Sequence, residues 1–271
     1  MSRRRDVGGR CTDRRAADAG SDRSRAWNRA QSHIVGVSLM IGLTVLALGG
    51  LTVAIGTVVD SGASDAEANR VAEAMTIVAE PGDVIGTAEA ELRFGDGSLT
   101  TERRTIRVID ASDGSVIERV DSDVLVYTVD DYTVVGGNGA VLRSAGSGAT
   151  MVERPSVVAD RGSSGVLLLG APEIDAENVS FGTNGQARVT LRAAVSHQRL
   201  DLGERTVRLA VQTAYPRAWA EFFERKGATV VNRSRTFTED GADAESSVVA
   251  EFSGQRRTYL VVHQTDLEVL P

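Results

Sequence analysis

A long apolar run near the amino terminus is the strongest pattern in the chain. Ile34–Val59 contains no charged residue, and only Ser38 and three threonines interrupt its apolar side chains. At about 1.5 Å per residue, a helix over this run is about 39 Å long, which exceeds the roughly 30 Å hydrocarbon core of a bilayer. The hydroxyl groups can bond carbonyls of the preceding turn, so lipid tolerates them. We expect a transmembrane helix over 31–59; a buried core helix is the alternative.

The segment 60–82 is expected to be a polar break followed by a short amphipathic helix. Asp60–Gly62 ends the apolar run. Ser64 and Glu67 then have the spacing of a capping box, in which each side chain bonds the other residue's backbone amide. Pro81 and the glycine after it end the segment. Helical spacing continues through 65–79, with apolar positions at Val71, Met75 and Val78.

Beyond residue 83 the apolar positions change from a helical to an alternating period. Apolar and polar residues alternate in 89–94 and 104–109, and glycine-containing turns follow these runs. Many short strands with one apolar face predict a mainly antiparallel β domain over 83–271, packed as a sandwich or an open barrel. One short helix interrupts it near 216–226. The predicted fold class is therefore α+β, a long apolar helix followed by a β-rich domain.

Charge is divided sharply on the two sides of the apolar run. Residues 1–30 hold nine arginines and four aspartates, for a net charge of +5, whereas the whole chain carries −7 and the remainder therefore −12. This leader is poor in apolar residues, so we expect it to be disordered. Clustered arginines stay on the cytoplasmic side of an inserted helix. The predicted arrangement is single-pass in the cell membrane, with a cytoplasmic amino terminus and an acidic extracellular domain that does not bind nucleic acid.

Few residues in the chain suggest chemistry. The single cysteine, Cys11, lies in the leader, so the β domain has no disulfide. His197 and His263 have no second histidine or cysteine at ligand spacing, which argues against a zinc site. No G-x-S-x-G nucleophile elbow is present. We therefore predict no catalytic residue, metal or cofactor, and we do not expect an enzyme.

Two further patterns are weaker candidates for ligand sites. Gly136–Gly139 is rich in glycine, but strands flank it and no Gly-Lys-Ser/Thr follows, so a hairpin loop is favoured over a phosphate loop. Carboxylates cluster at Asp130–Asp131 and at Glu239, Asp240 and Asp243. Such oxygens can bind Ca²⁺, but the twelve-residue loop pattern is missing. Solvated turns are the favoured interpretation.

The start of the apolar helix resembles a processing site. Residues 29–36 read RAQSHIVG and lead directly into the apolar run. This segment resembles the start of archaeal type IV pilin and archaellin precursors, in which a membrane peptidase removes the leader on the cytoplasmic side and the helix is kept. The resemblance places the cut between Ala30 and Gln31, with Arg29 as the preceding charge. His33 stands where many archaeal pilins have proline, and an uncut signal anchor is the alternative.

The whole chain is also similar to a haloarchaeal family of pilin-like membrane proteins. Three segments carry this likeness: the stretch from Ala30 to Val37, the stretch from Gly136 to Val141, and Tyr215–Trp219. The resemblance implies a surface-facing protein with no assigned chemistry.

Small residues recur along the apolar helix and permit close approach of another helix. Three glycines repeat every seven residues, so they drift only slowly around one face. Two pairs also have the small-x-x-x-small spacing. The residues concerned are Ser38, Gly42, Gly49, Gly50, Ala54 and Gly56. Packing against identical helices is one interpretation; the other is that glycine is simply frequent in membrane helices.

Two sequons lie in the part of the chain predicted to be extracellular. Asn178 and Asn232 each begin an Asn-x-Ser pattern, which is an acceptor for N-glycosylation. Short patterns of this kind also arise by chance, so both residues are candidates only.

The favoured hypothesis is a membrane-anchored, pilin-like cell-surface protein. Its partners would be the lipid bilayer, a prepilin-type peptidase and other pilin-like subunits, and it would be a processed filament subunit or a minor component. The alternative is an uncleaved, signal-anchored surface domain that binds an envelope partner or ligand. An all-apolar helix can exchange lipid neighbours for other apolar helices without exposure to water.

Overall fold

The computed structural model describes most of the chain, in two compact units. The structure describes the backbone of residues 19–79, 86–146, 148–160, 165–176, 179–241 and 244–270. Within these ranges it does not describe the side chains of residues 19–36, 53–61, 96, 183 and 184. The units are Met1–Asp60 and Ser61–Pro271, and each is described by itself.

The first unit contains most of one long helix, α1 (Ala19–Ala74). Residues 19–30 of the predicted disordered leader are helical, while residues 1–18 lie outside the described part. In the part of the chain that the structure describes, no helix is both long enough and apolar enough to cross a bilayer. Of the predicted span, side chains are described only for 37–52, and the anchor over 31–59 stays a prediction.

The expected polar break is wrong, because α1 continues through Asp60–Gly62 without interruption. Gly62 costs a helix only about 1 kcal/mol relative to alanine, and this segment contains no proline. The helix ends at Ala74, and a short turn of helix, α2 (Thr76–Ala79), follows. The second compact unit begins at Ser61 rather than at residue 83, so the end of α1 belongs to the β-rich domain.

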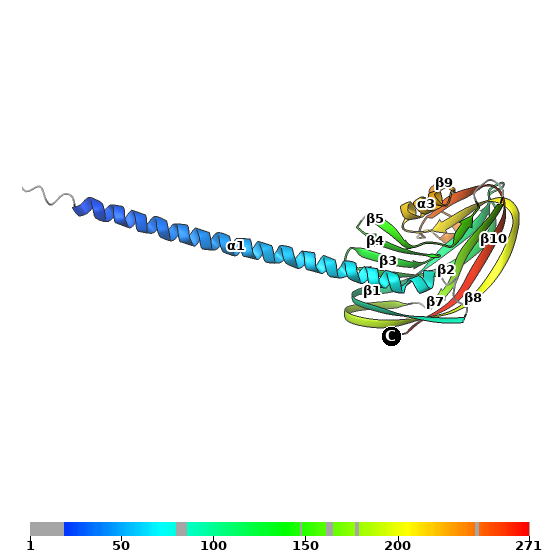
Figure 1. The fold of residues 1–271 in the computed structure, drawn as a ribbon, viewed down its shortest axis with the longest axis horizontal. Helices are drawn as coiled ribbons and strands as arrows, with labels where there is room; N and C mark the ends of the chain where they lie inside the picture. Colours follow the sequence, from blue (N-terminus) through cyan, green and yellow to red (C-terminus); the bar gives the residue numbers. More distant parts are fainter. Residues whose placement is uncertain are drawn as a thin grey trace, which may run out of the picture. The chain divides into compact units, whose positions relative to one another are not determined.

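The second unit is built on one large sheet. Its order is β5-β4-β3-β2-β1-β8-β10-β7-β6, with β9 paired to β10; Figure 1 shows the strands curving strongly. The strands are β1 (Gly86–Asp110), β2 (Val116–Val129), β3 (Tyr132–Gly137), β4 (Ala140–Ala145), β5 (Gly148–Glu153), β6 (Val157–Ala159), β7 (Gly165–Ala176), β8 (Ser180–Gln212), β9 (Thr229–Arg235) and β10 (Ser247–Leu270).

The α+β class is confirmed, but the sheet is open and mixed rather than a sandwich. Most neighbouring strands pair antiparallel, while β7 and β10 run parallel. The longest strands are also bent. The register of β1 on β8 runs from Gly86 opposite Val195 to Thr100 opposite Ser180, and Ile106 lies opposite Val211. Two straight strands cannot form both sets of pairings, so β1 and β8 must curve together.

The end of α1 forms one hydrophobic core with the sheet. Ala68, Val71 and Ala72 of α1, together with Met75 directly after it, are all at most 1 % exposed. They pack in a cluster with apolar residues from β1, β2, β3, β4, β7, β8 and β10. Gly136 permits this contact, since a Cβ there would lie 2.9 Å from the Cβ of Met75. The predicted amphipathic helix is therefore real, but it is the buried end of a longer one.

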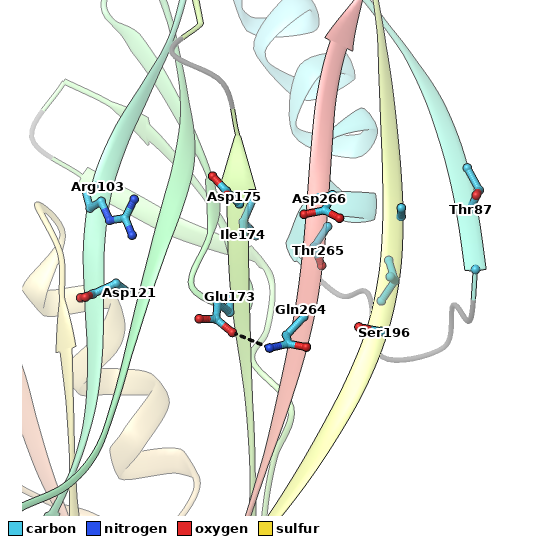
Figure 2. A pocket seen from close by; sticks show the side chains of 13 residues that line it. Thr87, Arg103, Asp121, Glu173, Ile174, Asp175, Ser196, Gln264, Thr265 and Asp266 are labelled. Atoms are coloured by element: carbon cyan, nitrogen blue, oxygen red, sulfur yellow. Dashed lines mark hydrogen bonds between the residues drawn. The ribbon is translucent and has the colours of Figure 1, made fainter.

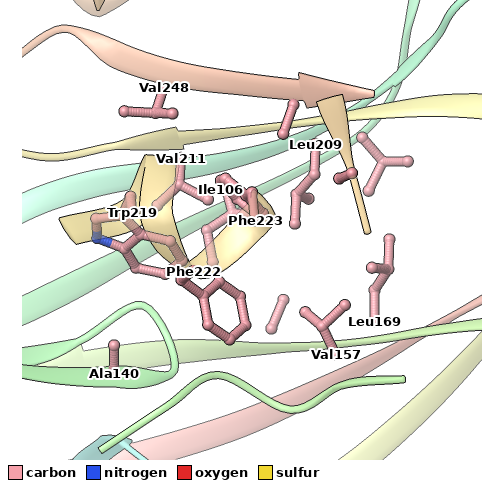
Figure 3. Close-up of a cluster of buried hydrophobic side chains, with 14 of the residues drawn as sticks. Ile106, Ala140, Val157, Leu169, Leu209, Val211, Trp219, Phe222, Phe223 and Val248 are labelled. Atoms are coloured by element: carbon pink, nitrogen blue, oxygen red, sulfur yellow. The ribbon is translucent and has the colours of Figure 1, made fainter. Parts of the chain in front are cut away.

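A second core lies under helix α3 (Pro216–Arg225), which confirms the helix predicted near 216–226. Trp219, Phe222 and Phe223 are buried against the sheet, and their rings contact one another (Figure 3). In β4, Ala140 and Leu142 belong to the core beneath α3, whereas Val141 between them belongs to the core around the end of α1. Successive residues of a strand face opposite ways, so α3 and the end of α1 lie on opposite faces there.

The loop Gly136–Gly139 is confirmed as a hairpin. Asn138 and Gly139 alone connect β3 to β4, and their φ angles are 53° and 78°. Two central residues with positive φ are typical of a type I′ turn, which matches the twist of paired strands and favours Asn-Gly.

We predict that Trp219→Ala lowers the free energy of unfolding by about 3–5 kcal/mol, because it leaves a large cavity beneath α3. Arg217→Ala, on the exposed side of the same helix, should change it by less than about 0.5 kcal/mol. Urea unfolding of the full chain in mild detergent, followed by circular dichroism, measures both. Equal effects of the two variants would contradict the assigned core.

Candidate functional site

The described apolar part of α1 has its large side chains exposed. Met40 is 74 % exposed and Leu46 76 %, and each of the other large apolar side chains between Val37 and Leu51 is more than half exposed. An apolar surface that extends all round a helix is costly in water and indicates a lipid or protein environment. This surface is the first candidate site.

The small residues of this helix leave open space beside it. A Cβ placed on Gly42, Gly49 or Gly50 would meet no atom within 4 Å, and Ser38 is exposed. Ala54, like Gly56, has its side chain outside the described part. Two threonine hydroxyls bond back to the preceding turn, as predicted: Thr44 donates to the Met40 carbonyl and Thr52 to the Leu48 carbonyl, each at 2.8 Å. The described glycines are thus available to a neighbouring helix.

Polar contacts fasten the buried end of α1 to the sheet. The Ser64 hydroxyl donates to Asp130 Oδ2 at 2.5 Å, and the Tyr127 hydroxyl donates to Glu67. One turn of helix also places Asp65 against Arg143 of β4. The predicted capping box is therefore wrong, because the helix does not begin at Ser64. The same two side chains instead bond residues of β2 and of the turn after it.

The predicted processing and glycosylation residues are only partly described. Arg29, Ala30 and Gln31 lie within α1, but their side chains are outside the description. Asn232 is exposed on β9, and its side-chain oxygen accepts a hydrogen bond from the Ser234 amide at 2.9 Å. Asn178 lies outside the described residues.

A polar groove of about 550 Å³ crosses the sheet. Figure 2 shows its side chains on β1, β7, β8, β10 and β2. Carboxylates predominate among its charged groups, with a single guanidinium: Asp121, Glu173, Asp175, Asp266 and Arg103. An acidic lining favours cationic or polar ligands over anions.

Two groove carboxylates are already engaged by neighbours. Glu173 accepts a hydrogen bond from the Gln264 amide at 3.2 Å. Burial acts to raise the pKa of Asp121, but hydrogen bonds from Thr105, at 2.8 Å, and Arg119 outweigh it and hold the pKa below its usual value. Asp121 therefore stays ionised near neutral pH.

Three of the carboxylates considered for Ca²⁺, Asp130, Glu239 and Asp240, have other partners. Asp240 pairs with the buried Arg107 and, at 3.6 Å, with Arg119. Asp130 accepts from Ser64, and Asp243 lies outside the described residues. Among the residues that the structure describes, no three His, Cys, Asp or Glu side chains gather as a metal-binding group.

Two segments singled out in the sequence meet in the structure. The Asn138 side-chain amide donates to the Gln212 carbonyl at 3.2 Å, just before the Tyr215–Trp219 segment. The hydroxyls of Ser144 and Tyr215 lie 3.1 Å apart. The hairpin of β3 and β4 is therefore fastened to the start of α3, which gives both segments a structural role.

Sequence reasoning missed a pair of histidines. His197 and His263 lie directly opposite each other on β8 and β10, and their Nδ1 atoms are 2.8 Å apart. Burial and the neighbouring His197 lower the pKa of His263. The two residues are far apart in sequence, and only the pairing of these strands could have revealed the contact.

The fold and these surfaces define an α+β protein with an exposed apolar helix and an acidic β domain. The chain belongs to DUF7289, a family of unknown function, whose pattern matches residues 29–268. No curated protein and no solved structure matches the chain.

Proposed function

We propose that this chain is a pilin-like cell-surface protein, anchored in the cell membrane by the apolar part of α1 and presenting its β domain outside. The single observation that carries the proposal is the exposed apolar surface from Val37 to Leu51. The uncharged run continues on both sides of it, from Ile34 to Val59. A helix of about 39 Å without charge suits a bilayer core of about 30 Å.

Continuity of α1 also supports the pilin-like interpretation. One helix carries an exposed apolar segment and then a segment buried in the β domain. A single helix that carries both segments suits a subunit held by its helix.

Charge supports the proposed orientation. The nine arginines of residues 1–30 precede the apolar run, whereas the rest of the chain is acidic. Clustered arginines favour the cytoplasmic side, so the β domain would be extracellular.

The anchoring proposal predicts that Leu43→Arg with Leu46→Arg moves the protein out of the membrane fraction. Each arginine at a helix centre costs insertion about 2.5–3.5 kcal/mol. Val158→Arg with Leu168→Arg, two exposed apolar residues of the β domain, is the matched control and should stay with the membrane. Alkaline extraction of membranes followed by immunoblotting gives the measurement. Recovery of the unmodified chain in the soluble fraction would refute the anchor.

Processing between Ala30 and Gln31 is the second part of the proposal. The family match begins at Arg29 and takes in the proposed cut, the apolar helix and the β domain. We expect the mature protein to begin at Gln31 when a prepilin-type peptidase is co-expressed, and at Met1 without it. Mass spectrometry of the amino-terminal peptide distinguishes the two. A chain that begins at Met1 in both cases would support the uncleaved signal anchor.

Assembly distinguishes a filament subunit from a solitary anchored domain that binds a partner. The open space beside Gly42, Gly49 and Gly50 permits close helix contact. We expect Gly42→Cys and Gly49→Cys, in a Cys11→Ser background, to form disulfide-linked dimers in membranes. Leu51→Cys, an exposed position on the helix face opposite Gly42 and Gly49, should crosslink less. Equal crosslinking at all three positions would contradict a specific packing face and favour the solitary anchor.

A further inference from the structure

We propose that His197 and His263 together form a two-nitrogen binding site for a divalent transition-metal ion, and that it prefers Cu²⁺ to Zn²⁺. The two imidazoles are brought together by strand pairing rather than by sequence spacing. His263 of β10 lies directly opposite His197 of β8 within a long uninterrupted stretch of antiparallel register. Their backbones are therefore fixed before any ligand arrives.

The geometry of the pair matches adjacent positions of a square-planar ion. The two Nδ1 atoms are hydrogen-bonded to each other at 2.8 Å, with the rings nearly perpendicular and their centroids 4.9 Å apart. A metal ion would replace the proton of this bond, and the ring that carries it would adopt the Nε2–H tautomer. Two metal–nitrogen bonds of about 2.0 Å at a right angle separate their nitrogens by about 2.8 Å, whereas a tetrahedral angle requires about 3.3 Å. Square-planar coordination is typical of Cu²⁺ and Ni²⁺ and tetrahedral coordination of Zn²⁺.

The surroundings hold one ring and leave the other accessible. His263 is 9 % exposed, and its Nε2 atom lies against β7, where a Cβ on Gly170 would approach it to 3.3 Å. This places its Nδ1 toward His197. His197 is exposed, so an ion can enter from its side.

The remaining coordination positions would belong to water. Within the described ranges no third His, Cys, Asp or Glu joins the pair. A site with two protein ligands is open, and imidazole nitrogen binds Cu²⁺ more strongly than the other divalent ions of the first transition row. The order of affinity should therefore be Cu²⁺, then Ni²⁺, then Zn²⁺.

The test is a Cu²⁺ titration of the full chain in detergent, followed by electron paramagnetic resonance. Every variant carries His33→Gln, because a free Gln31-Ser32-His33 terminus, which processing would create, chelates Cu²⁺ by itself. We expect one Cu²⁺ per chain, with two imidazole nitrogens in the spectrum. His197→Gln should weaken binding by about tenfold or more. Because His197 is exposed and a glutamine side chain can still hydrogen-bond to His263, this variant should keep the melting temperature of the parent.

A matched control moves the ring without changing the number of histidines. In His197→Gln with Gln198→His, the imidazole points to the opposite face of β8, since neighbouring strand residues alternate. This double variant should bind Cu²⁺ as weakly as His197→Gln. The proposal is overturned if either variant binds Cu²⁺ as tightly as the parent, if the parent spectrum shows fewer than two imidazole nitrogens, or if Zn²⁺ binds more tightly than Cu²⁺.

Discussion

Burial of the last turns of α1 is the interaction on which the β-rich domain depends. Ala68 and Ala72 are small enough for the sheet to approach the helix closely, and Met75 fills the space above Gly136. Alanine side chains and a glycine at the contact lower the distance between backbones, so the apolar atoms pack at the density of a protein interior. Without this helix one face of the sheet would expose its apolar residues, among them Leu92, Leu125 and Leu191.

Polar contacts then fix the helix in one position. Ser64, Asp65 and Glu67 each contact a residue of the sheet or of the turn after β2. Hydrophobic burial is not directional, so it would allow the helix to slide or rotate. Three contacts within one turn of helix define its register. The second core, under Trp219 and its neighbours, completes the domain on the opposite face.

Much of this architecture could be predicted from local patterns, and the errors share one cause. The hairpin at Asn138 and Gly139 and the helix after Pro216 follow from local backbone preferences, and both are present. The break at Asp60–Gly62 was wrong because local preference there is weak and burial of the following turns decides the outcome. Ser64 and Glu67 have capping-box spacing, yet their partners lie some sixty residues away along the chain.

The candidate sites also divide into those that the local sequence reveals and those that depend on contacts between distant parts of the chain. The exposed apolar segment of α1 was evident from composition, since lack of charge needs no fold to be seen. The contact between His197 and His263, and the groove lined by Asp121, Glu173 and Asp266, depend on strand order and register. The long bent strands β1 and β8 could not be inferred from short alternating runs, because alternation fixes which face a residue occupies but not which strand is its neighbour.

Hydrogen exchange of the full chain in detergent tests the central claim most directly. If residues 64–79 are part of the core, their amides should exchange only on global opening of the domain, with the same free energy as the amides of β8 and β10. Rapid exchange of residues 64–79 while β8 and β10 stay protected would show that the helix end merely rests on a sheet that is stable without it, and would contradict this account.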